Sequence, residues 1–473
     1  MATQTKPAAA SAPNYLVPFI TITALFCIFG FITSLNNALV PQMKSIFDLS
    51  YGKAMLTTSA FFLAYLFFSI PSSWLIEAIG YKRTIVISLF VQVVGAMLFI
   101  PAAIYLSFAF FLTAIFILAA GVTALQTAAN PYVSILGPEH SAPARLTLAQ
   151  AFNALGQAAG PAVVGWFILT DPAKVATKAA IANTVQAPFM AIAGGLLLLG
   201  LAVMFMRLPA ITRSESYRPG ADSTASTGRS IWSYRHTVLA TLGIFFYVGV
   251  EVTLAGIAIN YFLAQGLDGA KVGSFFASLG NFGAVLTNFF GPWTSVKIAG
   301  ILVSLYWLGS LVGRFLGTWL LTFIRSEKLL TVFGFLGVAL MLVSMFSSGP
   351  VAIWSLVFCG FANSIMFPNI FALGIAGLGP MTSKGSGLIV TACFGGAVIP
   401  PIYGALADKI EKMYAIAHDP AGVQDAIAHN LTYHSVIAER VGIQYAFIVP
   451  ILCYLYVAYF GLSGYKPTSA VKA

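Results

Sequence analysis

The sequence predicts an all-α membrane protein with twelve transmembrane helices in two six-helix halves. Three observations carry this prediction: 59% of the 473 residues are hydrophobic, only 8% are charged, and the mean hydropathy is +0.89. A soluble domain carries about 25% charged residues, so most of this surface faces lipid. The apolar runs are near-continuous over about 20 residues and lack the alternation of a β-barrel, which indicates helices.

The first six spans are separated by Gly, Pro and charged residues. The earliest run is too long for a signal-peptide core, so we count it as an uncleaved span. These spans are 15–40, 54–79, 84–104, 107–136, 146–169 and 185–206. The segment 207–236 then interrupts the pattern; it is polar, basic and rich in Ser and Thr, which predicts a solvated linker. We therefore expect an N-terminal half over 1–206 and a cytoplasmic linker over 207–236.

The second six spans follow the linker and define a C-terminal half over 237–473. They are 237–263, 298–324, 329–347, 351–377, 385–407 and 443–463. Between the last two runs lies a polar segment, 408–441, that we expect to be a long outer loop. Its three histidines, His418, His429 and His434, have no metal-binding spacing and are expected to be solvated. The four cysteines lie far apart in apolar runs, so they are expected to be core residues.

The net charge of +10 does not indicate a nucleic-acid partner, because the basic residues are spread over short loops and form no basic domain. With both termini inside, most of the 24 Lys and Arg residues fall on inner segments, as the positive-inside rule requires. We therefore predict cytoplasmic termini. The length of the helical spans favours a plasma membrane or a bacterial inner membrane over an outer membrane.

The two halves contain similar short segments in the same order. Asn130 and Pro131 of the fourth span correspond to Asn363 and Pro368 of the tenth, and the segment 136–138 reappears at 378–380. Any one of these similarities could arise by chance in a sequence of low diversity. Several in the same order indicate a parallel six-plus-six repeat, whose binding site is expected between the halves.

Amide side chains follow helical spacing inside the spans. The positions on the fifth span are three and four residues apart, and those on the fourth are one turn apart, so each set shares a helix face. Such amides can simply link helices. Stripes on neighbouring spans favour a shared cavity, where amides offer the donors and acceptors that sugar hydroxyls need. The candidates are Asn37, Gln126, Asn130, Gln150, Asn153 and Gln157.

Two fully charged residues lie deep in the predicted spans, Glu251 in the seventh and Arg314 in the eighth. A charge at the bilayer centre costs roughly 2.5–3.5 kcal/mol on insertion scales, so each is a functional candidate, with a structural ion pair as the alternative. No span carries the convergent nucleophile, base or metal ligands of an enzyme. The absence of a soluble domain also disfavours a receptor or scaffold.

Six segments resemble one branch of a known family. They are 34–42, 126–139, 145–156, 247–251, 313–320 and 363–375, and they are similar to the fucose permease and glucose/galactose permease branch of the major facilitator superfamily. The similarity runs from about 14 to 407. It implies the major facilitator fold and uptake of a hexose or deoxyhexose by alternating access, with a co-transported sodium ion or proton and no cofactor. It also implies a monomer whose partners are the sugar and the bilayer.

The resemblance also assigns roles to residues. Gln150 and Asn153 match the family's sugar-binding amides, Gln126 and Asn130 lie beside the central cavity, and Asn363 is the candidate of the second half. The stretch 73–83 resembles the superfamily's inner-loop gating signature, with Ser73 replacing its first glycine. The gating candidates are Glu77, Gly80, Lys82 and Arg83.

Two positions depart from the family pattern. Fucose permeases carry Asp where Asn37 stands and Glu where Gln126 stands, and an amide cannot take up a proton at either place. Coupling of sugar uptake to a cation would then depend on Glu251 with Arg314. The alternatives that stay open are an uncoupled sugar facilitator and an exporter of another small solute.

Overall fold

The computed structural model describes residues 19–33, 56–136, 138–167, 178–206, 230–267, 295–428 and 435–467. The candidate Asn37 and most of the linker 207–236 lie outside these residues, as does most of 264–297. The described residues are almost entirely helical.

The N-terminal half consists of helices that match the first six predicted spans. The first is the helix Phe19–Thr33, the described part of the span 15–40. It is followed by α3 (Leu56–Ile79), α4 (Tyr81–Met97), α5 (Phe99–Ile104), α6 (Phe108–Ile135), a 3-10 turn at Glu139–Ser141, α7 (Ala142–Phe167) and α8 (Lys178–Phe205).

The C-terminal half matches the other six spans but contains more breaks. It begins with a 3-10 turn at Ile231–Ser233. The helices are α9 (Arg235–Ala264), α12 (Ser295–Leu320), α13 (Ser326–Phe346), α14 (Pro350–Asn363), α15 (Met366–Ile375), α16 (Thr382–Thr391), α17 (Gly395–His418), α18 (Pro420–Ala428), α19 (Val436–Ala446) and α20 (Ile448–Tyr459). Two more 3-10 turns lie at Gly379–Met381 and Ala392–Phe394, and a π-helix at Phe460–Gly464 ends the last span.

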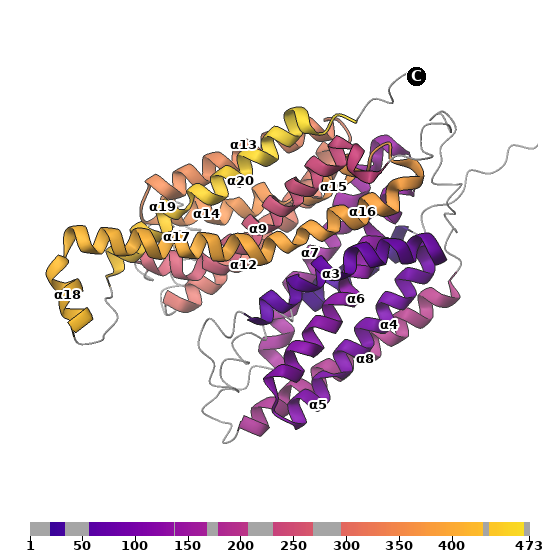
Figure 1. Cartoon of the computed structure of the whole chain (residues 1–473), viewed down its shortest axis with the longest axis horizontal. Coiled ribbons are helices and arrows are strands. Elements are labelled where there is room, and N and C mark those ends of the chain that lie inside the picture. The colour runs from indigo at the N-terminus through magenta and orange to yellow at the C-terminus, as the bar shows by residue number, and fades with distance from the viewer. Residues whose placement is uncertain are drawn as a thin grey trace, which may run out of the picture.

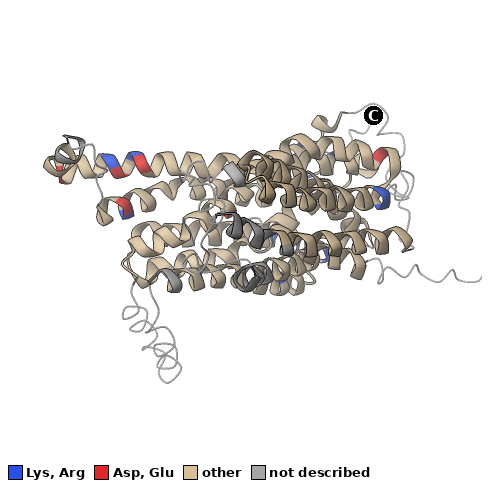
Figure 2. Cartoon of the chain, turned by 90° about the horizontal axis from the view of Figure 1, so that it is seen from below, with Lys and Arg blue, Asp and Glu red and all other residues tan. Residues whose placement is uncertain are grey.

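Length and apolarity support membrane crossing. Among the described residues, nine helical segments are long and apolar enough to cross a bilayer, and two shorter apolar helices accompany them. Figure 2 shows Lys, Arg, Asp and Glu gathered toward the two ends of the long axis, with a largely uncharged middle. This distribution is expected where hydrocarbon surrounds the middle of the protein.

The segment 408–441 was predicted to be a loop, and this part of the prediction was wrong because most of its described residues are helical. Helix α17 runs without a break from the membrane segment to His418, and α18 follows at Pro420–Ala428. The charged residues of 408–418 end the apolar run but not the helix, because a helix can continue into water when its charges face solvent. Figure 1 shows this extension projecting beyond the other helices.

The two groups of helices lie side by side in Figure 1, the indigo-to-magenta N-terminal helices against the rose-to-yellow C-terminal ones. They meet where α3 and α6 pack on α16, and where α7 packs on α12 and α15. Small residues make the closest approach possible: a Cβ at Gly387 of α16 would lie only 2.7 Å from the Cβ of Ser73 on α3. The candidate site lies next to this interface.

Candidate functional site

The amides of α6 are buried beside a proline. Ser107 caps the helix by accepting from the Phe110 backbone N–H, and Pro131 lies inside its last turns. Gln126 and Asn130 are 8% and 0% exposed. Polar side chains at this depth need hydrogen-bond partners or a ligand, because an unmet buried group costs about 1–3 kcal/mol.

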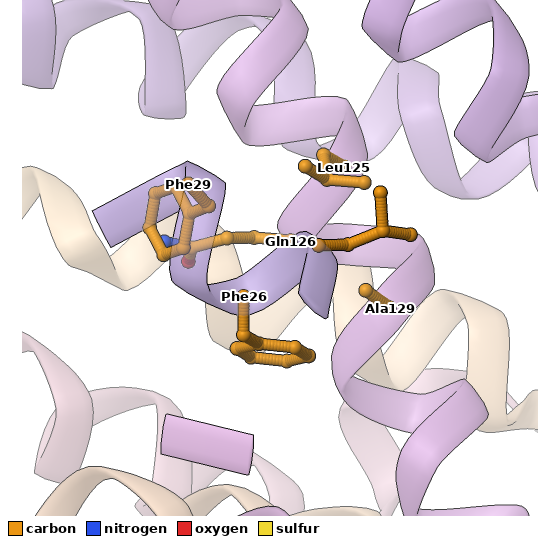
Figure 3. A pocket seen from close by; sticks show the side chains of 6 residues that line it. Phe26, Phe29, Leu125, Gln126 and Ala129 are labelled. Atoms are coloured by element: carbon orange, nitrogen blue, oxygen red, sulfur yellow. The ribbon is translucent and has the colours of Figure 1, made fainter. Parts of the chain in front are cut away.

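Gln126 lines a pocket between α6 and the helix Phe19–Thr33. Its Nε2 donates to the Tyr65 hydroxyl at 3.2 Å, whereas its Oε1 is buried without a hydrogen-bond partner among the described residues. Figure 3 shows the Gln126 side chain reaching from α6 toward Phe29, with Phe26 on the other side of the opening. The remaining lining is apolar, from Leu25, Leu125 and Ala129. The unpaired Oε1 is therefore buried next to an apolar pocket lined by two aromatic rings.

Two glycines bring α7 against the helix Phe19–Thr33. A Cβ at Gly30 would overlap the backbone of Asn153, and one at Gly156 would overlap the backbone of Cys27, so only glycine permits this approach. As a result the Asn153 Nδ2 donates to the Phe26 carbonyl at 3.2 Å. The row of amides continues along α7, because the Gln157 Nε2 donates to the Asn153 Oδ1 at 3.1 Å.

The fourth and fifth spans meet through their amides. The Gln150 Nε2 lies 3.5 Å from the Asn130 Oδ1, which is the longest hydrogen bond of the site, and the Asn130 Nδ2 has no hydrogen-bond partner within the described part of the chain. The structure thus brings Gln126, Asn130, Gln150, Asn153 and Gln157 together, as their helical spacing predicts. It leaves the Gln126 Oε1 and the Asn130 Nδ2, both on α6, buried without a hydrogen-bond partner among the described residues.

Asn363 has a different environment. It is fully buried, donates from Nδ2 to the Tyr306 hydroxyl at 2.7 Å, and accepts from the Tyr454 hydroxyl at 2.7 Å. Both polar ends of the amide are therefore occupied by side chains of the C-terminal half. These contacts are those of a residue that links α12, α14 and α20.

The two membrane charges lie near each other. An Arg314 Nη2 is 3.9 Å from the Glu251 Oε1, and the side chains are 5% and 18% exposed. The Tyr247 hydroxyl donates to the same carboxylate oxygen at 2.7 Å. Arg314 also donates from Nη1 to the Gln150 carbonyl at 2.8 Å and from Nε to the Ser364 carbonyl at 3.2 Å. The guanidinium therefore connects Glu251 with the backbone of the amide-bearing helix α7.

The gating candidates lie where α3 turns into α4. Gly80 separates the helices with φ of +85°, a conformation that other residues rarely adopt. Glu77 reaches the other half: its Oε1 accepts from the Ser383 hydroxyl at 3.0 Å and lies 3.9 Å from the Lys384 Nζ. Lys82 instead donates to the Met204 carbonyl of α8 at 2.8 Å. Arg83 is exposed.

Sequence reasoning missed several partners of these residues. Tyr65 and Tyr247 hold Gln126 and Glu251, and Ser386 donates to the Thr127 carbonyl across the interface at 2.7 Å. A buried tyrosine needs a partner for its hydroxyl, but the chain has 19 tyrosines and the pattern does not single out these two. Within the described residues, no group of three or more His, Cys, Asp or Glu could hold a metal ion.

Twelve helical spans in two halves, with buried amides and an ion pair at their interface, define a membrane transporter rather than an enzyme. The Major Facilitator Superfamily model matches residues 21–401, and the chain belongs to this family. The resemblance inferred from the sequence motifs is thereby confirmed, and so is the predicted fold class.

Two relatives with named cargoes match the chain over most of its length. A glucose/galactose transporter of Brucella abortus is 38% identical over 456 residues, covering 96% of both chains. An L-fucose-proton symporter of Escherichia coli is 32% identical over 415 residues, covering 85% of this chain and 89% of that one. Among solved structures, the transporter FucP in the outward conformation has a TM-score of 0.74 and 29% identity, covering 96% of this chain and 99% of the other.

Proposed function

We propose that this chain takes up a hexose or deoxyhexose of the glucose, galactose or fucose class by alternating access. The observation that carries the proposal is the amide cluster, in which the Gln126 Oε1 and the Asn130 Nδ2 are buried and unpaired. A sugar hydroxyl both donates and accepts, so it can meet both needs at once. The relatives named glucose/galactose transporter and L-fucose-proton symporter support the same class of cargo.

The proposed sugar site lies between the first, fourth and fifth spans. Gln126, Asn130 and Gln150 would contact the hydroxyls, and Asn153 with Gln157 would hold α7 in place and contribute when the sugar displaces their mutual bond. Phe26 and Phe29 line the pocket and can pack on the C–H face of the ring. Asn37 stays a candidate at the outer end of the first span, and Asn363 is assigned to the support of the C-terminal half. The arrangement of the amides on the fourth and fifth spans favours a polar, hydroxylated cargo over an apolar one.

Cation coupling is proposed to occur at Glu251. Asn37 and Gln126 cannot titrate, whereas the Glu251 carboxylate can accept a proton or help to coordinate sodium. The relative named L-fucose-proton symporter favours the proton. A second candidate is an uncoupled facilitator, and it is favoured by one observation: Arg314 lies 3.9 Å from the carboxylate and can neutralise it permanently.

The membrane orientation and state follow from the same proposal. Both termini and the linker 207–236 would be cytoplasmic, in a plasma or bacterial inner membrane, with the halves spanning 1–206 and 237–473 and the protein acting as a monomer. The contacts of Glu77 with Ser383 and Lys384 would then close the cytoplasmic end. The similarity to FucP in the outward conformation supports this assignment.

The decisive experiment is uptake of labelled glucose, galactose and fucose into proteoliposomes under imposed proton and sodium gradients. The parent should take up at least one of the three sugars. Gln150→Ala should weaken sugar binding by roughly five- to 150-fold, because about 1–3 kcal/mol is lost with a buried hydrogen-bond partner. Ser72→Ala is a matched control, since Ser72 is buried and donates only to the Phe68 carbonyl of its own helix. Uptake of none of the sugars would refute the proposal.

A further inference from the structure

Pro131 of α6 leaves one backbone carbonyl without its helical partner. Proline has no backbone N–H, so the carbonyl four residues earlier cannot form the usual helical hydrogen bond. Pro131 inside α6 leaves the Thr127 carbonyl without this bond, whereas Ser364 lies at the break between α14 and α15 and belongs to neither helix. Both carbonyls are buried in residues that are 0% exposed, where an unpaired acceptor is unfavourable.

The Thr127 carbonyl is bonded by the other half. The Ser386 hydroxyl of α16 donates to it at 2.7 Å, and Ser386 is itself 0% exposed. The helices can approach this closely because Gly387 lies directly against Ser73 and the Ser69 carbonyl of α3. Pro131 therefore leaves the Thr127 carbonyl of the N-terminal half free to accept, at the position where the Ser386 hydroxyl of the C-terminal half donates.

The Ser364 carbonyl serves as an anchor for Arg314. The Nε of Arg314 donates to it at 3.2 Å, which fixes the guanidinium plane, and Nη1 then reaches the Gln150 carbonyl of the N-terminal half at 2.8 Å. A Cβ at Gly313 would overlap the Ser364 side chain, so glycine is needed for α12 to lie this close to the junction of α14 and α15. The planar guanidinium group can donate to two acceptors that lie in fixed directions.

We propose that Ser386 and Arg314 are positioning residues of the transport cycle, which hold the halves together by donating to the Thr127 and Gln150 carbonyls of the N-terminal half, and that Pro131 keeps the Thr127 carbonyl free for Ser386. The inference rests on the proposed alternating-access transport. When the halves separate, water enters and takes the place of Ser386 on the Thr127 carbonyl. The acceptor is thus satisfied by Ser386 in the closed state and by water in the open state, never by its own helix.

Hydrogen–deuterium exchange of the full chain in lipid nanodiscs, without sugar, tests the proposal. Ser386→Ala should raise the exchange rate of amides in α16 and the adjoining end of α6 by roughly two- to tenfold, the range expected for one hydrogen bond that stabilises the closed state. Ser134→Ala is the matched control, because the Ser134 hydroxyl donates at 3.0 Å only to the Asn130 carbonyl of its own helix. It should leave the exchange of α16 at the parent rate.

Pro131→Ala provides the independent variant. The new N–H can bond the Thr127 carbonyl within α6, so this variant should raise the exchange rate of amides in α16 as Ser386→Ala does. The variant that combines Ser386→Ala with Pro131→Ala should exchange no faster than the faster of the two single variants. Arg314→Lys keeps the charge beside Glu251 but loses the planar guanidinium group, and it should speed exchange in α7 and α12. Parent rates in both Ser386→Ala and Pro131→Ala, or additive effects in the double variant, would overturn the proposal. Sugar binding is measured separately, so a parent that binds no sugar would defeat the proposed function without deciding this test.

Discussion

The substitution Glu251→Gln removes one negative charge from the middle of the C-terminal half and changes little else. The glutamine keeps the length of the side chain and an oxygen that can accept from the Tyr247 hydroxyl, which donates to Glu251 at 2.7 Å. The change therefore isolates the electrostatic attraction between the carboxylate and Arg314, whose nearest nitrogen is 3.9 Å away.

The attraction between Glu251 and Arg314 that this substitution removes follows from the distance between their charges. Two unit charges about 4 Å apart interact by about 4 kcal/mol at an effective dielectric constant of 20. The loss of hydration around a carboxylate that is only 18% exposed offsets part of this attraction. A coupling of about 1–3 kcal/mol between the cation and the sugar corresponds to a five- to 150-fold change in binding.

The assay is concentrative uptake into proteoliposomes. The parent should accumulate labelled sugar under an inward proton or sodium gradient, whereas Glu251→Gln should only equilibrate it. Glu327→Gln is the control, because Glu327 is a buried carboxylate of the same half that pairs with Arg325 instead; it should keep the accumulation of the parent. Equal accumulation by the parent and Glu251→Gln would refute the coupling role. A parent that never accumulates sugar would establish the uncoupled facilitator.

Three further predictions concern the site and the topology. Gln126→Leu should weaken sugar binding by roughly five- to 150-fold, measured by calorimetry, because the unpaired Oε1 is lost. Tyr65→Phe keeps the amide and should weaken binding less; the reverse order would contradict the assigned contacts. Asn363→Ala should lower the free energy of unfolding by about 1–3 kcal/mol, measured by thermal unfolding, since two buried tyrosine hydroxyls lose their partner. Tags at both termini and in 207–236 should be reached only from the cytoplasm and a tag in 408–441 only from outside, so a linker tag labelled from outside would disprove the orientation.

The spans could be predicted because hydrocarbon imposes a strong and simple constraint. Each needs about 20 apolar residues with internally bonded backbone, and all twelve predicted runs coincide with helices among the described residues. The breaks inside the last spans could not be predicted. The junction between α14 and α15 depends on the local backbone at Ser364 and Ile365, which composition does not encode.

The grouping of the amides was predictable, whereas their individual contacts were not. Spacing of three and four residues places Gln150, Asn153 and Gln157 on one face of α7 whatever surrounds them. Which amide is left unpaired depends on how each helix is rotated against its neighbours. Asn363 occupies the repeat position of Asn130, yet the tyrosines of α12 and α20 occupy both ends of its amide. Repeat symmetry relates backbones and does not ensure equal chemistry.

The extension of α17 has a practical consequence for imaging. A transporter of 50.2 kDa that is almost wholly embedded in a detergent or lipid belt gives particle images few features for alignment. Helix α17 continues from the apolar span into the charged residues 408–418 as one element of 24 residues, about 36 Å long at 1.5 Å per residue. An antibody fragment raised against its protruding part would therefore be held rigidly by the C-terminal half. Its angle in the images would report the tilt of that half directly.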